Sequence, residues 1–395
     1  MLKFLNLKTK IKNTNPKHIF TVKGVCLGFL FFLFIYFVSS SSLFSTKYDS
    51  AIAEVPVKEA VKQPAFVPIV LDSVAYNKKL NEIANNVIPV IVAPTVLKSS
   101  TKVDQKGLKP TTQVVPVPPS KKYLWPVKTV EPNAGALLPF NRIIAYYGNF
   151  YSTKMGVLGE YSTDIMLKKL NSEVESWELA DPSTPVIPAI HYIAVTAQGS
   201  PGSDGKYRFR MPDSQIDHAV ELAKKINGIV FLDIQVGLSD VQTEIPIFEK
   251  YLKMPEVHLG LDPEFSMKTG VKPGKVIGTM DATDINFAAN YLAKLVKDNN
   301  LPPKVLIIHR FTNKMLTNYK QITPLPEVQI VVDMDGWGFG AKKINTYKQV
   351  VHNEPIQFAG FKLFYKNDLR APSTRMLTPK DLLELTPQPM YIQYQ

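Results

Sequence analysis

The segment 258–264 reads HLGLDPE and places two acidic residues on either side of a proline. If the segment is a strand, Asp262 and Glu264 face one side, while Leu259 and Leu261 face the other. Two neighbouring carboxyl groups repel one another when both are ionised, so the pKa of one of them rises. A carboxyl that keeps its proton near neutral pH suits general acid catalysis. The spacing therefore indicates that Asp262 and Glu264 form a catalytic pair.

Other apolar runs also turn polar or ionisable at one end. Asp333 and Asp335 follow a β-branched run and share a face in a strand, with Trp337 in line after them. Glycoside hydrolysis uses paired carboxylates around an oxocarbenium-like transition state, and aromatic rings can stack on sugars. We therefore expect a polysaccharide or glycan as the bound partner. The residues expected to bind this substrate are Asp233, Gln235, Asp333, Asp335, Tyr147, His191, His309, Trp337 and Tyr365. Further aromatic candidates for stacking are Tyr146, Tyr192 and Phe265.

Short runs rich in β-branched residues alternate with amphipathic stretches from Tyr123 onward, a pattern typical of repeated βαβ units. The expected strands are Arg142–Phe150, Val186–Val195, Ile229–Gly237, Val257–Phe265, Val276–Asp281, Lys304–Thr312, Val328–Trp337 and Phe358–Tyr365. The expected helices are Thr163–Glu178, Asp213–Asn227, Val241–Met254, Asp284–Asn299, Lys314–Gln321 and Ala341–Val351. Asp213 and Asp284 are the expected N-caps of their helices.

This alternation predicts an α/β fold, a (β/α)8 TIM barrel, whose active site lies at the carboxyl ends of the strands. The alternative is a doubly wound sheet. The eightfold repeat argues against it, and so does the lack of a G-x-G-x-x-G turn after the first run.

The D-x-E at the end of the fourth run resembles the arrangement in glycoside hydrolase family 25 lysozymes and family 18 chitinase-type barrels. The resemblance implies that Glu264 is the acid and that Asp262 orients the N-acetyl group of the substrate. The chain departs from the chitinase pattern at Gly260 and Val257, where that pattern has aspartates. It departs from the lysozyme pattern at the first run, which offers Tyr146, Tyr147 and Asn149 in place of an acid.

The stretch from Arg142 to Tyr365 more closely resembles a little-characterised group of exported bacterial barrel proteins with an L-D-P-E-aromatic motif on strand four. This resemblance implies the barrel fold and export from the cytoplasm. It implies no particular activity.

Two other readings stay open beside a glycoside hydrolase. A metal-dependent hydrolase could use His191 and His309 with nearby aspartates, but the H-x-H that amidohydrolase barrels carry on the first strand is missing. We therefore expect no metal and no cofactor. A non-catalytic glycan-binding or envelope scaffold protein is the alternative outside the enzymes. Gly336–Lys343 could cradle a phosphate, but its aromatic residues favour a wall beside a sugar.

The composition is that of a globular protein. The chain has 395 residues, of which 45% are hydrophobic and 20% charged, which excludes a wholly disordered chain. Its one cysteine, Cys26, excludes a disulfide framework and any cysteine-cluster metal site. The net charge is +12, and six lysines with no acid lie in residues 1–23. About half of the excess charge is therefore local, and we expect no nucleic-acid partner.

The amino-terminal quarter predicts export. Residues 1–23 form a basic cytoplasmic tail by the positive-inside rule. Residues 24–46 are uncharged and apolar enough for a short transmembrane signal anchor in the lipid bilayer, with a cleaved signal peptide as the alternative. Residues 47–121 are a Pro-rich, largely disordered linker, apart from the island Asp72–Asn86, which has helical spacing. Residues 122–395 are the barrel domain, expected at the cell surface or in the periplasm.

Overall fold

Residues 70–84 and 130–395 are described by the computed structural model. Their main feature is one sheet of nine strands, in which eight parallel strands close on themselves through the pairing of the first with both the second and the last. The ninth, β3 (Arg208–Arg210), pairs antiparallel with the end of β2 only. The predicted (β/α)8 barrel is therefore the fold of this chain.

The barrel strands follow one another around the barrel in chain order. They are β1 (Arg142–Gly148), β2 (Val186–Ala197), β4 (Ile229–Ile234), β5 (Val257–Leu261), β7 (Lys304–Arg310), β9 (Val328–Met334), β10 (Phe358–Leu363) and β11 (Tyr391–Tyr394). The strand before Asp262 is thus the fourth of the barrel, as the sequence predicts.

One expected barrel strand is wrong and another was missed. In the run Val276–Asp281 only β6 (Met280–Asp281) is extended, and it pairs with β8 (Leu316–Thr317) outside the barrel. The preceding loop, 268–279, is rich in glycine, proline and lysine, which disfavour a strand. The strand that closes the barrel is β11, which pairs with β1 and β10.

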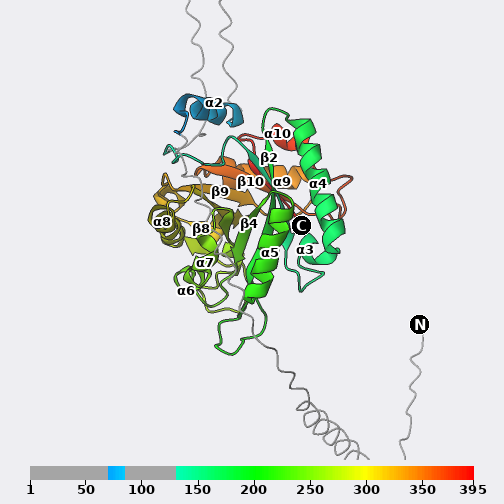
Figure 1. The fold of residues 1–395 in the computed structure, drawn as a ribbon. Coiled ribbons are helices and arrows are strands. Elements are labelled where there is room, and N and C mark those ends of the chain that lie inside the picture. The colour runs from blue at the N-terminus through cyan, green and yellow to red at the C-terminus, as the bar shows by residue number, and fades with distance from the viewer. Residues whose placement is uncertain (1–69, 85–129) are drawn as a thin grey trace, which may run out of the picture. The chain divides into compact units, whose positions relative to one another are not determined.

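Helices cover the outside of the barrel, and Figure 1 shows α4 and α8 on opposite sides of it. The α-helices around the barrel are α3 (Val157–Glu160), α4 (Thr163–Ala180), α5 (Asp213–Lys225), α6 (Val241–Glu244), α7 (Glu249–Leu252), α8 (Ala282–Asn299), α9 (Gly340–Tyr347) and α10 (Pro379–Leu383). Shorter 3-10 turns are η2 (Ile245–Phe248), η3 (Pro263–Phe265), η4 (Asn313–Met315) and η5 (Tyr319–Gln321), and η6 (Lys348–His352) is a π-helical turn. Their apolar faces and the outward faces of the strands form the larger hydrophobic core.

Several expected helices differ in detail. Val241–Met254 is broken into α6, η2 and α7, with Pro246 near the start of the 3-10 turn. Lys314–Gln321 is not a helix but two 3-10 turns around β8, because Asn318 adopts a left-handed conformation. The predicted caps also shift by a few residues. Asp281 caps α8 while Asp284 closes its capping box, and Pro212 precedes α5 at the cap position.

The island with helical spacing forms α2 (Ser73–Ile83), which begins at the capping side chain of Asp72. Tyr76, Leu80 and Ile83 on one face of α2 join the smaller hydrophobic core inside the barrel. That core contains the residues at the amino ends of the strands, so α2 closes this end of the barrel (Figure 1, blue). The rest of the expected linker, the basic tail and the apolar segment 24–46 lie outside the described residues.

No helix within residues 70–84 and 130–395 is long and apolar enough to cross a bilayer. The expected anchor lies outside these ranges, so membrane attachment stays a prediction.

The barrel interior changes character along β4 and β7. Inward side chains near the amino ends are apolar, for example Phe231 on β4 and Ile307 on β7. Two residues further on, the same face carries Asp233 and His309, which are fully buried. The period of two along a strand therefore sets a polar layer directly above an apolar one.

Candidate active site

A cavity of about 460 Å³ opens at the carboxyl ends of the barrel strands. Predicted site residues that line it are Tyr147, Gln235, Asp262, Glu264, Asp335 and Trp337. Other lining residues include Lys154, Phe265, Phe311, Lys342, Lys362, Phe364 and Gln395. A concave site at this end of a barrel, with several convergent polar groups, is where such folds place their active sites.

The two carboxyl groups of the D-P-E segment both line this cavity, although strand alternation is not what brings them there. β5 ends at Leu261, and Pro263 starts the 3-10 turn η3. The side chain of Asp262 caps this turn by accepting a hydrogen bond from the backbone N–H of Glu264 at 3.2 Å. The turn therefore orients Glu264, and Asp262 is a structural cap as well as a cavity residue.

Both carboxyl groups hold their protons more tightly than usual. Burial, followed by the charge of Asp335, raises the pKa of Glu264 to about 7, while Lys362 and His309 oppose that rise. Burial, together with the charges of Asp233, Asp335 and Glu264, raises the pKa of Asp262 well above its ordinary value. The prediction that a neighbouring acid would raise one pKa is thus correct in direction, but burial is the larger cause.

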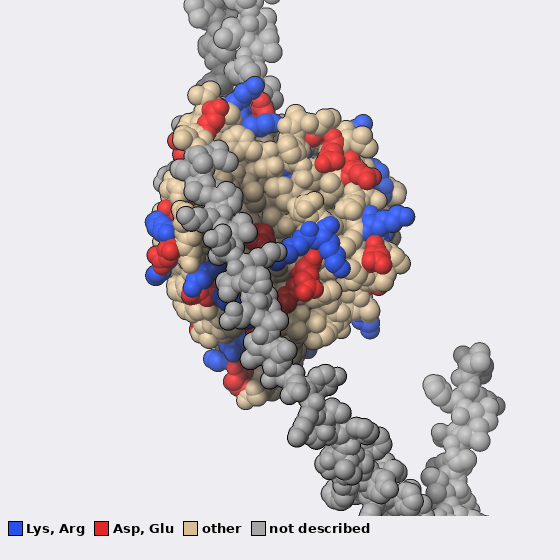
Figure 2. All heavy atoms as spheres, viewed as in Figure 1, with Lys and Arg blue, Asp and Glu red and all other residues tan. Residues whose placement is uncertain are grey.

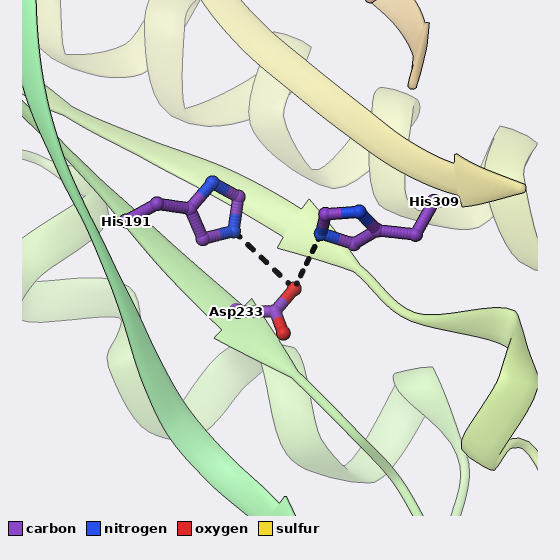
Figure 3. Close-up of side chains that lie close together, drawn as sticks. All are labelled: His191, Asp233 and His309. Carbon is purple, nitrogen blue, oxygen red and sulfur yellow. Dashed lines mark ion pairs between the residues drawn. The ribbon is translucent and has the colours of Figure 1, made fainter. Parts of the chain in front are cut away.

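Below the cavity lies a fully buried cluster of three side chains from three strands (Figure 3). Asp233 Oδ1 lies 3.4 Å from His191 Nε2 and 3.5 Å from His309 Nε2. Burial lowers the pKa of His191 to about 4. Burial alone would also lower the pKa of His309, but the neighbouring carboxylates of Asp233 and Asp333 raise it well above the usual value. Among the described residues this is the one group whose histidine and carboxylate atoms lie close enough to share a metal ion.

Two further aspartates pair with His309, one from the next strand and one from the residues after it. Its Nδ1 lies 3.1 Å from Asp333 and 3.5 Å from Asp335. Asp333 fits there because residue 360 on the next strand is glycine, where a Cβ would lie 2.8 Å from Asp333 Oδ1. The expectation that Asp333 and Asp335 share a face is confirmed, but of the two only Asp335 lines the cavity.

Three polar side chains link the buried cluster to the cavity. The hydroxyl of Tyr147 donates to Asp233 Oδ2 at 2.9 Å. Gln235 donates to both Tyr147 and Asp262, at 3.2 and 3.3 Å. The ammonium of Lys362 lies 3.2 Å from Asp335 and 3.8 Å from the centre of the Tyr147 ring. A substrate that touches Tyr147 therefore contacts a group bonded directly to the buried cluster, and one that touches Gln235 contacts it through Tyr147.

The aromatic candidates divide between the inside and the outside of the barrel. Tyr147, Phe265 and Trp337 line the cavity, and the indole of Trp337 is 46% exposed. Tyr146 precedes the inward-facing Tyr147, and Tyr192 follows the inward-facing His191. Both side chains therefore face the outside of the barrel, where Tyr192 stacks on Phe150.

Tyr365, a predicted substrate-binding residue, lies away from the cavity. Its ring stacks on Tyr394, and its hydroxyl contacts Tyr146 and Glu173 behind the strands. It lines a separate pocket of about 130 Å³. We therefore leave Tyr365 out of the site.

Sequence reasoning missed some residues that the structure places in or under the cavity. Lys362 stands at the ionisable end of its apolar run and shares a face with Gly360, but the sequence gave no reason to assign it a role in the site. Tyr391 and Gln393 were missed because β11 has only four residues at the end of the chain. The hydroxyl of Tyr391 is hydrogen-bonded to His191 Nδ1 at 2.6 Å, and the side-chain amide of Gln393 donates to the same hydroxyl.

Basic and acidic side chains are interspersed on the face shown in Figure 2. Lys154, Lys342 and Lys362 line the same cavity as the carboxyl groups of Asp335 and Glu264, and Lys362 pairs with Asp335. The cavity thus combines proton-bearing acids, one aspartate paired with a lysine, and aromatic walls. This set can donate a proton to an ether or glycosidic oxygen.

No known protein-family model matches this sequence, and no curated protein matches it. Distant structural neighbours are barrels of glycoside hydrolases. One is a GH5-4 broad specificity endoglucanase from an uncultured bovine rumen ciliate, with 12% identity, a TM-score of 0.28, and coverage of 52% of this chain and 72% of the other. Another GH5-4 endoglucanase, from an uncultured bacterium, has 7% identity, a TM-score of 0.30, and coverage of 56% and 76%. A GH18 chitinase from Pseudoalteromonas aurantia has 11% identity, a TM-score of 0.21, and coverage of 57% and 68%. At TM-scores below 0.5 these likenesses decide nothing about activity.

Proposed function

We propose that this chain is a glycoside hydrolase that acts on a polysaccharide, with peptidoglycan or another N-acetyl-hexosamine polymer as the preferred class. The observation that carries the proposal is Glu264. It lies in a cavity at the carboxyl end of the barrel, and its pKa is raised to about 7. A carboxylic acid that is still protonated near neutral pH can donate to the leaving oxygen of a glycosidic bond.

The neighbouring groups fit this assignment. Asp262 accepts hydrogen bonds from Gln235 and from the backbone of Glu264, so its carboxyl group is fixed in orientation beside the acid. In the families that the D-x-E motif resembles, this aspartate orients the N-acetyl group that acts as internal nucleophile, and we assign that role to Asp262 here. Trp337 supplies an exposed aromatic face at the cavity on which a sugar ring can stack.

The place of action is the cell envelope. The basic residues 1–23 and the apolar segment 24–46 support a membrane anchor with the barrel on the extracytoplasmic side. The enzyme would then act on a polymer close to the membrane surface.

The test is hydrolysis by the full-length chain in detergent, on peptidoglycan, chitin oligomers and envelope polysaccharides. Glu264→Gln keeps the size of the side chain and removes its acid, so turnover should fall by about 10²- to 10⁴-fold. Glu178→Gln, on the exposed face of α4, is the matched control and should keep full activity. Circular dichroism spectra should match wild type for both variants, and neither unfolding midpoint should fall below that of wild type.

The same assay separates the hydrolase from a glycan-binding scaffold. Pull-down of each insoluble glycan is measured for the wild type and for Glu264→Gln. Binding without turnover, equal in the two proteins, would reject the hydrolase and leave a binding protein. Turnover that survives in Glu264→Gln would reject Glu264 as the acid.

A further inference from the structure

Three buried polar atoms beneath the cavity converge without a hydrogen-bond partner. They are His191 Nε2, Asp233 Oδ1 and His309 Nε2, from β2, β4 and β7. Their side chains are fully buried and do not line the cavity. Figure 3 shows both histidine nitrogens directed toward Asp233 Oδ1. Since buried polar atoms are nearly always satisfied, three orphaned atoms this close together indicate that an ion or a proton lies between them.

The distances fit a metal ion better than a hydrogen bond. Asp233 Oδ1 is 3.4 Å from His191 Nε2 and 3.5 Å from His309 Nε2. An N–H···O hydrogen bond is usually about 2.7 to 3.2 Å long. Ligand atoms held at about 2.0 to 2.1 Å around a tetrahedral zinc ion lie about 3.3 to 3.4 Å apart. Both measured distances are close to this tetrahedral edge.

The other polar atom of each side chain is already engaged. His309 Nδ1 lies 3.1 Å from Asp333 Oδ2, and His191 Nδ1 lies 2.6 Å from the hydroxyl of Tyr391. Asp233 Oδ2 accepts from Tyr147. Metal-bound histidines typically donate their other ring N–H to such an outer partner, which leaves the remaining nitrogen free to ligate. With Nδ1–H on both histidines, the two Nε2 lone pairs and Asp233 Oδ1 point to the same place.

A glycine keeps this place open. Residue 260 on β5 pairs in register with Asp233. A Cβ at Gly260 would lie 2.6 Å from His191 Nε2 and 2.8 Å from Asp233 Oδ1. Any larger residue would therefore push into the three unpartnered atoms.

We propose that His191, Asp233 and His309 bind a divalent transition-metal ion, with zinc as the first choice. Two imidazoles and one carboxylate are a donor set that zinc accepts, and solvent can supply a fourth ligand. The ion ties β2, β4 and β7 together under the cavity and holds Asp233 in place beneath Tyr147. This site is separate from the acid Glu264 and does not depend on the proposed hydrolase activity. It departs from the sequence-based expectation that the chain has no metal.

The competing occupant of the same place is a proton on His309 Nε2, shared with Asp233 across 3.5 Å. In that case the cluster is an ion pair and binds no metal. The two readings differ in metal content, so they can be separated without any activity assay.

The experiment measures zinc, iron, manganese, cobalt, nickel and copper by plasma mass spectrometry in the full-length chain purified in detergent. The expected result is about one metal ion per chain, as purified or after refolding with zinc sulfate. Chelation should lower the unfolding midpoint of the wild type, and zinc should restore it. Metal below about 0.1 per chain under both conditions would overturn the proposal.

Variants then locate the ion. His191→Asn and His309→Asn should each lose the metal and the response of the unfolding midpoint to zinc. His258→Asn is the control, because His258 is a buried barrel histidine whose Nε2 also lacks a partner but lies apart from this cluster. It should keep the metal. If the His309 variant keeps its metal while folded, or if the His258 variant loses it equally, the site is not the one proposed. Should the ligand variants fail to fold, the chelation result on the wild type decides.

Discussion

The two ends of the barrel interior are built by the same strands but have opposite chemistry. At the amino end Phe231 and Ile307 pack with α2 in an apolar core. Two residues later on the same strands, Asp233 and His309 form a buried polar cluster under the cavity. The apolar layer contributes stability through burial, whereas the polar layer costs desolvation that only well-placed partners offset. On β4 and β7 the side chain that contributes stability and the side chain that contributes chemistry are therefore two residues apart, on the same face of the strand.

The largest effect should come from the apolar layer. Phe231 is fully buried and stacks against His191 at 5.2 Å between ring centres. Phe231→Ala leaves a cavity in the barrel and should lower the free energy of unfolding by about 3 to 5 kcal/mol. Urea unfolding followed by circular dichroism measures this loss.

The matched control is Phe209→Ala on β3, because the side chain of Phe209 is 47% exposed. It should cost less than about 1 kcal/mol. Equal losses for the two variants would mean that the apolar layer does not set stability.

The polar layer should respond to pH instead. The pKa of Glu264 is raised to about 7 by burial and then by Asp335, against the opposing charges of Lys362 and His309. The protonated form donates to the leaving oxygen, so kcat/KM should fall as the pH rises through about 7. Hydrolysis measured across this range, at constant ionic strength, checks the expectation.

The same shift affects folding with a definite sign. Folded Glu264 keeps its proton at pH values at which the unfolded chain has lost it, so wild-type stability falls as the pH rises from the unfolded pKa to about 7. Glu264→Gln lacks this loss and should be more stable than wild type by about 1 to 3 kcal/mol above neutral pH. Near pH 4 the two proteins should be about equally stable. A variant that is less stable than wild type at every pH would contradict the shift.

A smaller effect is expected where α2 closes the amino end of the barrel. Leu80 is 2% exposed and packs into the apolar core, whereas Val74 on the same helix is 81% exposed. Leu80→Ala should cost about 1 to 2 kcal/mol, because α2 can detach before the barrel unfolds. Hydrogen exchange should speed up in α2 without changing near Glu264, and Val74→Ala should alter neither. Faster exchange at the cavity in the Leu80 variant would show that the two ends are coupled.

Local patterns were enough to find most of the polar layer. The amphipathic period predicted α4, α5 and α8, and β-branched runs predicted seven of the barrel strands. Asp233, His309 and Asp262 stand where such runs become polar, and in a barrel these ends meet. That argument needs only the order of the strands.

What depends on distant contacts was not visible in the sequence. Val276 and Ile277 look like part of a strand, yet both are exposed, and the strand that closes the barrel is the four-residue β11. β11 becomes a strand of the barrel because it pairs with β1, which lies more than two hundred residues away in the sequence. The convergence of His191, Asp233 and His309 likewise depends on the register between strands, and on the space above Gly260.

The smallest effect should separate substrate binding from chemistry within the polar end itself. Trp337 is 46% exposed, lines the cavity, and has the ammonium of Lys342 5.0 Å from its ring centre. Trp337→Ala removes a stacking surface worth about 1 kcal/mol, so KM should rise about fivefold while kcat changes less than about twofold. Phe339→Ala is the control, because Phe339 is similarly exposed on the same loop but does not line the cavity. A fall in kcat with KM unchanged would instead show that Trp337 contacts the transition state rather than the bound substrate.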